Sequence, residues 1–281
     1  MSESPVSQQA FWDRRAAAWE RRSESIDALS DAYGLPVMEA LRPAPGERIV
    51  DIGCGPGTTA IQLAGRVAPK GEVVGLDISP AMVAAAVRRA AAHGTVNVRF
   101  AVADAQRDVL EGGFDAAYSR FGVMFFDDPV AAFSNIGRAL RPGGRLACAV
   151  WSSLRDNPWM FVPTLAAVPA LEAELALPGE DDRGPFSLAD PKRVLDVLTS
   201  AGFFDVDIEV AEGSRLISAG DAGDNVTTLL EVGPLGEAFE AADDDTRRRA
   251  VDAVLASIEP YREEDGWRLP GSALKVLARH P

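Results

Sequence analysis

The chain has 281 residues, 47 % of them hydrophobic, which is enough for one α/β domain with a helical addition. Its formal net charge of −14 argues against a nucleic-acid partner, because phosphate binding needs a clustered positive surface. The two cysteines, Cys54 and Cys148, are far apart in the sequence, which argues against a disulfide framework and fits a cytoplasmic protein. The acidic start at 1–5 resembles no signal peptide, and no apolar stretch approaches the ~20 residues that span a bilayer, so we expect no membrane partner.

The first elements are predicted to be helical. Residues 9–23 form a helix on which Trp12 and Trp19, seven positions apart, share one face. A second helix is predicted at 26–41, because the turn signal at 43–46 follows it.

Strands and helices alternate from residue 48 onward. The dipeptides Ser79-Pro80 and Asp128-Pro129 are typical of helix starts. Alternation of this kind predicts βαβ units and a parallel sheet, and the continuous apolar runs indicate that both faces are covered. The predicted strands are 48–52, 72–76, 96–102, 114–119, 145–151, 204–211 and 272–278, and the helices among them are 58–67, 79–92, 128–140 and 191–201.

Two insertions interrupt the later part of this pattern, one at 152–190 and a helical-looking one at about 220–262. Their aromatic and apolar side chains suggest a pocket for a hydrophobic small molecule, although packing inside the insertions explains them equally well. The residues concerned are Trp151, Trp159, Met160, Phe161, Phe186 and Trp267.

A glycine-rich turn follows the first strand. Gly53, Gly55 and Gly57 can hold an anionic group against the backbone N–H groups at a helix start. A dinucleotide fingerprint needs a glycine where Thr58 stands, so the spacing counts against a nicotinamide dehydrogenase. The preceding Asp51 favours a cofactor that carries an amino group and a carboxylate.

Further polar residues follow the next strands, at the edge where open α/β sheets bind ligands. Asp77, twenty residues after Gly57, can accept hydrogen bonds from both hydroxyls of a ribose, and Ile78 can pack on a flat base. Asp104 and Ala105 are placed to meet an exocyclic amine.

Together with Arg141–Gly144, these motifs resemble the ordered motifs of class I S-adenosylmethionine (SAM)-dependent methyltransferases, and most of all the ubiquinone/menaquinone-biosynthesis-like small-molecule subgroup. The resemblance covers roughly residues 45–151. It implies a Rossmann-like, seven-stranded, mostly parallel sheet whose last strand is antiparallel. It also implies an N-terminal helical lid (1–44), a SAM-binding core (45–151) and substrate-side helical insertions with the remaining strands (152–281), in one integrated domain.

The resemblance also implies which residues bind SAM. Asp51 and Gly53, with Gly55 in the same turn, hold the methionine end, Asp77 binds the ribose, Ile78 and Met82 flank the adenine, Asp104 and Ala105 bind its amino edge, Ser119 and Phe121 lie near the methyl group, and Trp19 closes the site. No metal site is expected. Met82 and Trp19 are also explained by simple packing.

The sequence names no catalytic residue. Methyl transfer from SAM needs alignment and exclusion of water, and a base only for some acceptors. His93 and His280 are predicted to lie far from the site, which leaves Tyr33, Asp156 and Tyr261 as weak candidates.

We therefore predict methyl transfer from SAM to a hydrophobic or aromatic small molecule in secondary metabolism, with an O-, C- or N-acceptor left open and S-adenosylhomocysteine as the product. One alternative is a SAM-binding enzyme of the same fold that decarboxylates or cyclises its substrate, and another is a non-catalytic SAM-binding subunit. The oligomeric state also stays open, with a homodimer as one possibility.

Overall fold

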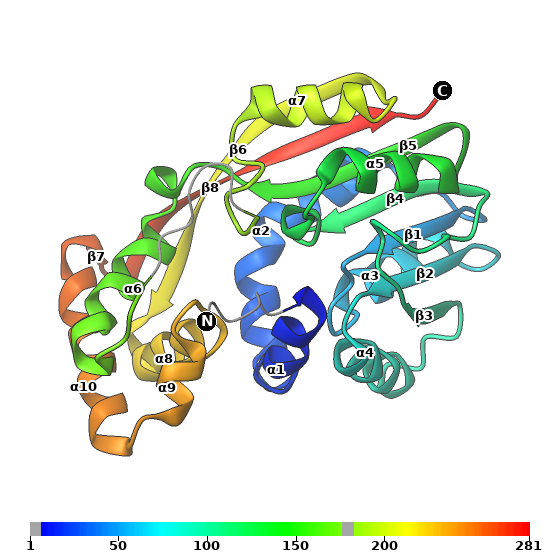
Figure 1. Ribbon diagram of the computed structural model, residues 1–281. Helices are drawn as coiled ribbons and strands as arrows, with labels where there is room; N and C mark the ends of the chain where they lie inside the picture. The colour runs from blue at the N-terminus through cyan, green and yellow to red at the C-terminus, as the bar shows by residue number, and fades with distance from the viewer. Residues whose placement is uncertain (1–6, 176–182) are drawn as a thin grey trace, which may run out of the picture.

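The computed structural model describes residues 7–175 and 183–281, which are built around one mixed β-sheet (Figure 1). Its strands are β1 (Arg48–Ile52), β2 (Glu72–Asp77), β3 (Val98–Val102), β4 (Phe114–Arg120), β5 (Leu140–Trp151), β6 (Phe204–Ser218), β7 (Arg262–Glu263) and β8 (Gly266–Arg279). In this described part of the chain their order is β3-β2-β1-β4-β5-β8-β6, with β7 paired to β8. Strands β1 to β5 pair in parallel, and β8 is antiparallel to both β5 and β6.

This topology confirms the predicted Rossmann-like sheet, which is mostly parallel with an antiparallel last strand. The additional strand β7 has two residues and is too short to leave a hydrophobic pattern in the sequence.

The antiparallel ribbon of β6 and β8 is much longer than the sequence predicts. Strands were expected at 204–211 and 272–278, but the pairing continues as far as Ser218 opposite Gly266. Gly213 lies opposite Gly271 in this extension, which therefore lacks the β-branched run that signals a strand. Backbone pairing between segments far apart in the sequence holds the extension together, and the ribbon leads from the sheet to a separate group of helices (Figure 1).

Two of the helices around the sheet begin at the predicted capping residues. Ser79 Oγ accepts a hydrogen bond from the Met82 N–H (3.1 Å), and Asp128 Oδ1 accepts one from the Ala131 N–H (3.0 Å). A proline follows each cap, where its missing N–H leaves no hydrogen bond unmade. The two are α4 (Pro80–Ala92) and α5 (Pro129–Ala139), and the sheet is also covered by α3 (Thr58–Val67) and α7 (Pro191–Ser200).

Four helices pack around the far end of the ribbon and form what we call the cap (Figure 1). They are α6 (Pro158–Leu171), α8 (Ala222–Val232), α9 (Gly236–Ala241) and α10 (Asp244–Ile258). Elsewhere in the fold as well as near the cap, short 3-10 turns occupy Val123–Phe125, Leu154–Asp156, Ala219–Asp221 and Glu259–Tyr261. The cap has its own hydrophobic core, in which Ile217 and Leu269 of the ribbon are buried with Val254 and Trp267. The cap is therefore a second packing unit, joined to the sheet through the ribbon.

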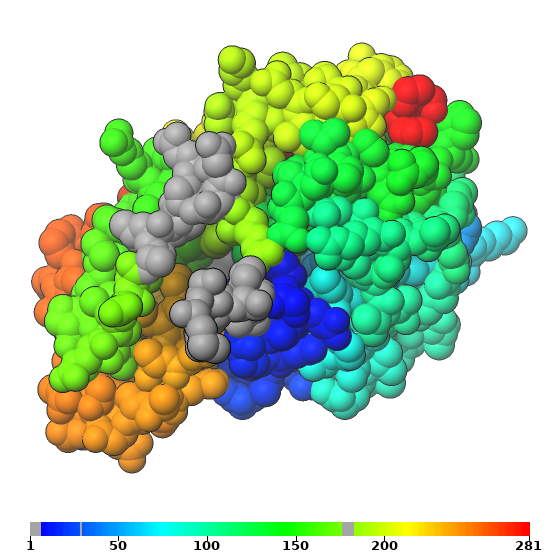
Figure 2. Space-filling view, viewed as in Figure 1, coloured from blue at the N-terminus to red at the C-terminus, as the bar shows by residue number. Residues whose placement is uncertain are grey.

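The N-terminal helices α1 (Gln8–Arg21) and α2 (Ser23–Leu41) lie between the sheet and the cap (Figures 1 and 2). On the sheet side, Asp13 accepts a hydrogen bond from Ser79 Oγ (2.5 Å), and on the cap side Arg15 pairs with Glu237 (3.4 Å). Helix α1 thus bridges the two packing units. Among the residues described, none of the helices is long and apolar enough to cross a membrane.

Candidate functional site

A cavity of about 890 Å³ lies between the sheet, α1 and the cap. The last residues of the five parallel strands line one side of it: Ile52, Asp77, Val102, Arg120 and Trp151. This is the edge at which open α/β sheets bind their ligands. Side chains of α6, α8 and β6 line the other end, so one continuous space joins the strand ends to the cap.

The turn after β1 brings its backbone against the loop after β4. Gly53 has a φ of +67°, and a Cβ there would lie only 2.9 Å from the Cα of Gly122. Gly55 also has a positive φ, but a Cβ at that position would meet nothing within 4 Å. A ligand in the cavity can therefore approach the backbone of this turn closely.

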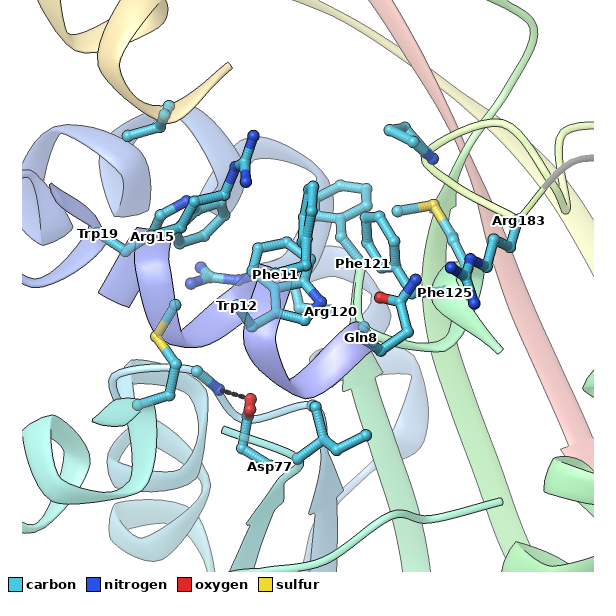
Figure 3. A pocket seen from close by; sticks show the side chains of 18 of the residues that line it. Gln8, Phe11, Trp12, Arg15, Trp19, Asp77, Arg120, Phe121, Phe125 and Arg183 are labelled. Atoms are coloured by element: carbon cyan, nitrogen blue, oxygen red, sulfur yellow. Dashed lines mark hydrogen bonds between the residues drawn. The ribbon is translucent and has the colours of Figure 1, made fainter. Parts of the chain in front are cut away.

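Asp77 is held at the end of β2 by two backbone donors, below helix α1 (Figure 3). Its carboxylate accepts hydrogen bonds from the N–H groups of Gly55 (2.9 Å) and Ser79 (2.9 Å). Burial raises the pKa of the Asp77 carboxyl, and these two hydrogen bonds oppose the rise. The geometry presents a fixed acceptor to the cavity, as the binding of ribose hydroxyls requires.

Most of the residues predicted to bind the cofactor come together here. Asp104 is fixed at the end of β3 because its Oδ1 accepts the Gln106 N–H (2.9 Å), and the Ala105 carbonyl accepts from Asn135 Nδ2 (2.8 Å). Met82 is almost fully buried and lines the cavity. The predicted residues in the lining are Trp19, Gly53, Gly55, Asp77, Ile78, Met82, Asp104 and Ala105.

The other two predicted residues, Asp51 and Ser119, lie behind the cavity wall. Asp51 is fully buried and accepts a hydrogen bond from the Thr59 hydroxyl (2.5 Å), while Ser119 Oγ donates to the Ile52 carbonyl (2.8 Å). Burial raises the pKa of Asp51 to about 7, although the Thr59 hydrogen bond opposes it. Both side chains support the strands that carry the glycine turn. Neither lines the cavity, so their direct contact with the cofactor stays a prediction.

Aromatic side chains of α1 cover the cavity near the glycine turn (Figure 3). Trp12 packs edge-on against both Trp19 (5.7 Å between ring centroids) and Phe125 (4.9 Å). The indole N–H of Trp19 is buried and has no hydrogen-bond partner among the described residues. Trp19, Gly55 and Asp77 line the same cavity, and an unsatisfied donor together with a fixed acceptor fits a cofactor that has ribose and carboxylate oxygens.

Further along the cavity, aromatic rings form a series that we call the aromatic wall. Phe121 stacks on Trp151 at 3.8 Å, and Trp151 contacts Trp159 at 5.0 Å. Met160, Phe161 and Phe186 also line this end, as the sequence suggested, whereas Trp267 lies outside the lining in the cap core and donates to Glu259 (3.0 Å).

Tyr33 is the candidate base that reaches the cavity. Burial raises the pKa of its phenol, which is therefore protonated at neutral pH and acts as a hydrogen-bond donor rather than a base. Its hydroxyl is buried and has no hydrogen-bond partner in the described chain. The other two candidates, Asp156 and Tyr261, lie outside the cavity lining, as do His93 and His280.

Arg215 was missed in the sequence because it stands in a stretch that was not recognised as a strand. It lines the cavity from β6, is 9 % exposed, and has no carboxylate within 4 Å among the described residues. Its guanidinium lies over the ring of Trp159, 4.6 Å from the centroid. Such stacking gains on the order of 2 kcal/mol in a desolvated site, whereas burying an unpaired charge costs several kcal/mol, so the stacking offsets only part of the cost of burial.

Burial lowers the pKa of Arg215 to about 9, and the side chain therefore stays charged at neutral pH. Arg215 therefore carries a positive charge, with no carboxylate partner among the described residues, in a largely apolar part of the cavity.

In the described residues no group of three or more His, Cys, Asp or Glu side chains could hold a metal ion.

Comparisons with known proteins agree with this geometry. Residues 49–144 match a family model described as a methyltransferase domain. The nocamycin O-methyltransferase of Saccharothrix syringae is 31 % identical over 203 residues, which cover 67 % of this chain and 71 % of that protein. The chain spans about half the length of several other curated relatives that it matches.

Solved structures share the fold. Phosphoethanolamine N-methyltransferase 2 from Haemonchus contortus, in complex with SAM, superposes with a TM-score of 0.61 at 20 % identity over 100 % of this chain and 61 % of that one. The (4+2)-cyclase SpnF superposes with a TM-score of 0.58 at 20 % identity over 96 % of this chain and 97 % of that one. Given the sequence match to a relative over more than two thirds of its length, the chain belongs to the class I SAM-dependent methyltransferases, and S-adenosylmethionine is its cofactor.

Proposed function

We propose that this protein transfers the methyl group of SAM to an oxygen atom of a hydrophobic or aromatic small molecule in secondary metabolism. The observation that carries the proposal is the continuity of the cavity, in which the glycine turn and Asp77 are joined to the aromatic wall. The name of the nocamycin relative, an O-methyltransferase, favours oxygen as the acceptor atom.

When bound, SAM supplies a methyl group that its sulfonium already activates. The main task of the protein is therefore to align the acceptor with that methyl group. In this proposal the backbone at Gly53 and Gly55 holds the methionine end and the Asp77 carboxylate holds the ribose hydroxyls. Phe121 and Trp151 stand at the ends of β4 and β5, between that region and the cap. They would orient a flat acceptor through its ring faces and exclude water from the reacting atoms.

We further propose that the segment 1–44 acts as a lid. Trp12 and Trp19 cover the cofactor region, while Asp13 and Arg15 tie α1 to the sheet and to the cap. The core 45–151 would bind the cofactor beneath the lid, and the segment 152–281 would supply the acceptor pocket within one integrated domain.

The test is incubation of the protein with SAM and a panel of phenols, enols and carboxylic acids, followed by detection of S-adenosylhomocysteine and of a methylated product. Formation of both supports the proposal. A cyclase of this fold exists, and the cavity lining offers no histidine, so the alternative is a rearrangement or cyclisation without methyl transfer. Conversion of a substrate with SAM recovered intact would establish that alternative instead.

A further inference from the structure

The acceptor end of the cavity contains a positive charge that the protein does not neutralise. In the described chain the other arginines of the lining each have a carboxylate partner, whereas Arg215 has none within 4 Å. A smaller neighbouring cavity that Arg215 also borders contains Glu24, Asp221 and Asp224, but none of these described carboxylates pairs with it. The paired arginines are Arg15 with Glu237, Arg107 with Asp127, Arg120 with Asp27, and Arg183 with Asp127.

A second unsatisfied donor belongs to the same region. The Tyr33 hydroxyl has no partner in the described residues, and its ring packs on Trp151 at 5.1 Å. The Tyr33 hydroxyl and Trp159 both lie against Gly271, and the Arg215 guanidinium lies over the Trp159 ring, so the two donors are near one another. Two donors of different residue types therefore lack an acceptor in one part of one cavity.

The ribbon is shaped to admit these groups. Gly213 and Gly271 lie opposite each other, and a Cβ on Gly271 would stand 2.3 Å from the Tyr33 hydroxyl and 2.8 Å from Trp159 Cδ1. Arg215 is two residues along β6 from Gly213, and so it projects on the same face of the ribbon. The missing side chains leave room for Tyr33 and Trp159 directly beside the guanidinium.

The position of this region assigns it to the acceptor. The aromatic wall of Phe121, Trp151 and Trp159 leads from the loop after β4 to Arg215, whereas the glycine turn and Asp77 lie at the ends of β1 and β2. A flat molecule lying along the wall would have its far end at the guanidinium.

We propose that Arg215 and Tyr33 form an anion subsite that binds a carboxylate of the methyl acceptor, so that the acceptor is an aromatic or polycyclic carboxylic acid. The planar guanidinium matches the two oxygens of a carboxylate, and one unpaired positive charge balances one negative charge. The acid group serves here as a binding handle on the molecule. The identification of the bound acid as the methyl acceptor rests on the proposed function, whereas binding of the acid at Arg215 does not require methyl transfer.

The experiment measures binding to the protein loaded with S-adenosylhomocysteine. Three acids of increasing size, 2-naphthoate, anthracene-2-carboxylate and anthraquinone-2-carboxylate, are titrated by calorimetry beside their primary amides. We expect at least one acid to bind tenfold or more tightly than its amide. In Arg215→Gln the acid should fall to the affinity of the amide, while the affinity of the amide stays within twofold. Tyr33→Phe should weaken only the acid, by a few-fold.

Two results would overturn the subsite. The first is the absence of any acid preference in all three pairs. The second is an unchanged acid preference in Arg215→Gln together with weaker binding of S-adenosylhomocysteine, which would assign the guanidinium to the carboxylate of the cofactor. Acid binding that depends on Arg215 in a protein that never forms S-adenosylhomocysteine from SAM would keep the subsite and refute the proposed methyl transfer.

Folding is controlled in the same series. Arg262 also stacks on a tryptophan, Trp267, at 4.4 Å, but it is half exposed and outside the cavity, so Arg262→Gln should leave all the affinities unchanged. Because an unpaired buried charge is removed, Arg215→Met should raise the melting temperature of the ligand-free protein. A lower melting temperature would indicate a structural role and count against the subsite. Arg215→Lys keeps the charge and should retain part of the acid preference.

Discussion

The two ends of the cavity are assembled from different parts of the chain. The end that we propose for the cofactor, hereafter the cofactor end, uses consecutive strand ends between Ile52 and Gly122, where backbone groups and short turns set the geometry. The end that we propose for the acceptor, hereafter the acceptor end, contains Tyr33, Trp159 and Arg215 from three distant elements, which meet because a long antiparallel ribbon carries β6 and β8 to the cap. A site built from the backbone of short turns tolerates few changes, whereas a site built from side chains can change its ligand one residue at a time.

If the two ends act independently, changes at the cofactor end should leave acceptor binding intact. Asp77→Asn replaces an acceptor oxygen with an NH₂ group that faces backbone donors, and we expect SAM affinity to fall about 10- to 100-fold. Calorimetry with SAM measures this, and the carboxylic-acid probes should bind as before. Glu72→Gln, at the opposite end of the same strand, is the matched control and should leave SAM affinity unchanged. Equal losses of affinity for SAM and for the carboxylic-acid probes would show that the two ends bind their ligands cooperatively.

The reverse test acts on the ribbon. Gly271→Ala places a Cβ against Tyr33 and Trp159, and this overpacking should destabilise the protein by about 1–3 kcal/mol. Chemical denaturation measures the change, and probe binding should weaken while SAM affinity is retained. At Gly112 a Cβ would meet nothing within 4 Å, so Gly112→Ala should have little effect. A stable Gly271→Ala protein with normal probe affinity would contradict the packing described for the ribbon.

Helix α1 lines the cavity and also contacts the cap, so its substitutions test how strongly the two ends of the cavity are coupled. Trp19→Ala should lower SAM affinity about tenfold, since it removes both the covering ring and the unsatisfied indole donor. Trp19→Phe keeps a ring and should lose only a few-fold. Unchanged SAM affinity in a well-folded Trp19→Ala protein would show that the tryptophan merely docks the helix.

The last prediction concerns the pH dependence of the free energy of unfolding, to which Asp51 contributes from behind the glycine turn. Its pKa is raised from 3.8 to about 7 in the folded protein, so the folded state binds the proton more tightly across that window. The carboxyl therefore destabilises the fold increasingly as pH rises from about 4 to 7. Asp51→Asn should gain stability relative to the original protein over this range, by at most about 1.4 kcal/mol per pH unit.

Denaturation at pH 5, 6, 7 and 8 measures this gain, and the exposed Asp252→Asn is the control. A difference that does not change with pH would mean that Asp51 titrates normally despite its burial.

Local sequence patterns were sufficient for much of the sheet and for the cofactor end. The cap at Ser79-Pro80, the turn at Gly53–Gly57 and the acids at 77 and 104 depend on neighbours within a few residues, and the structure places them as predicted. At Asp51 and Ser119 the motif predicts a position along a strand but not the direction of the side chain, so their contact with the cofactor stays a prediction.

By itself, the sequence determined the family, the succession of strands and helices along the core, and the strand ends at which we propose that the cofactor binds, because each depends on short patterns along the chain. Only the tertiary structure decided that the ribbon of β6 and β8 extends to the cap, since its hydrogen bonds join segments far apart in the sequence. It also decided which titratable groups lack partners. Whether Arg215 is paired or unpaired depends on every element packed around it, and no local pattern encodes that.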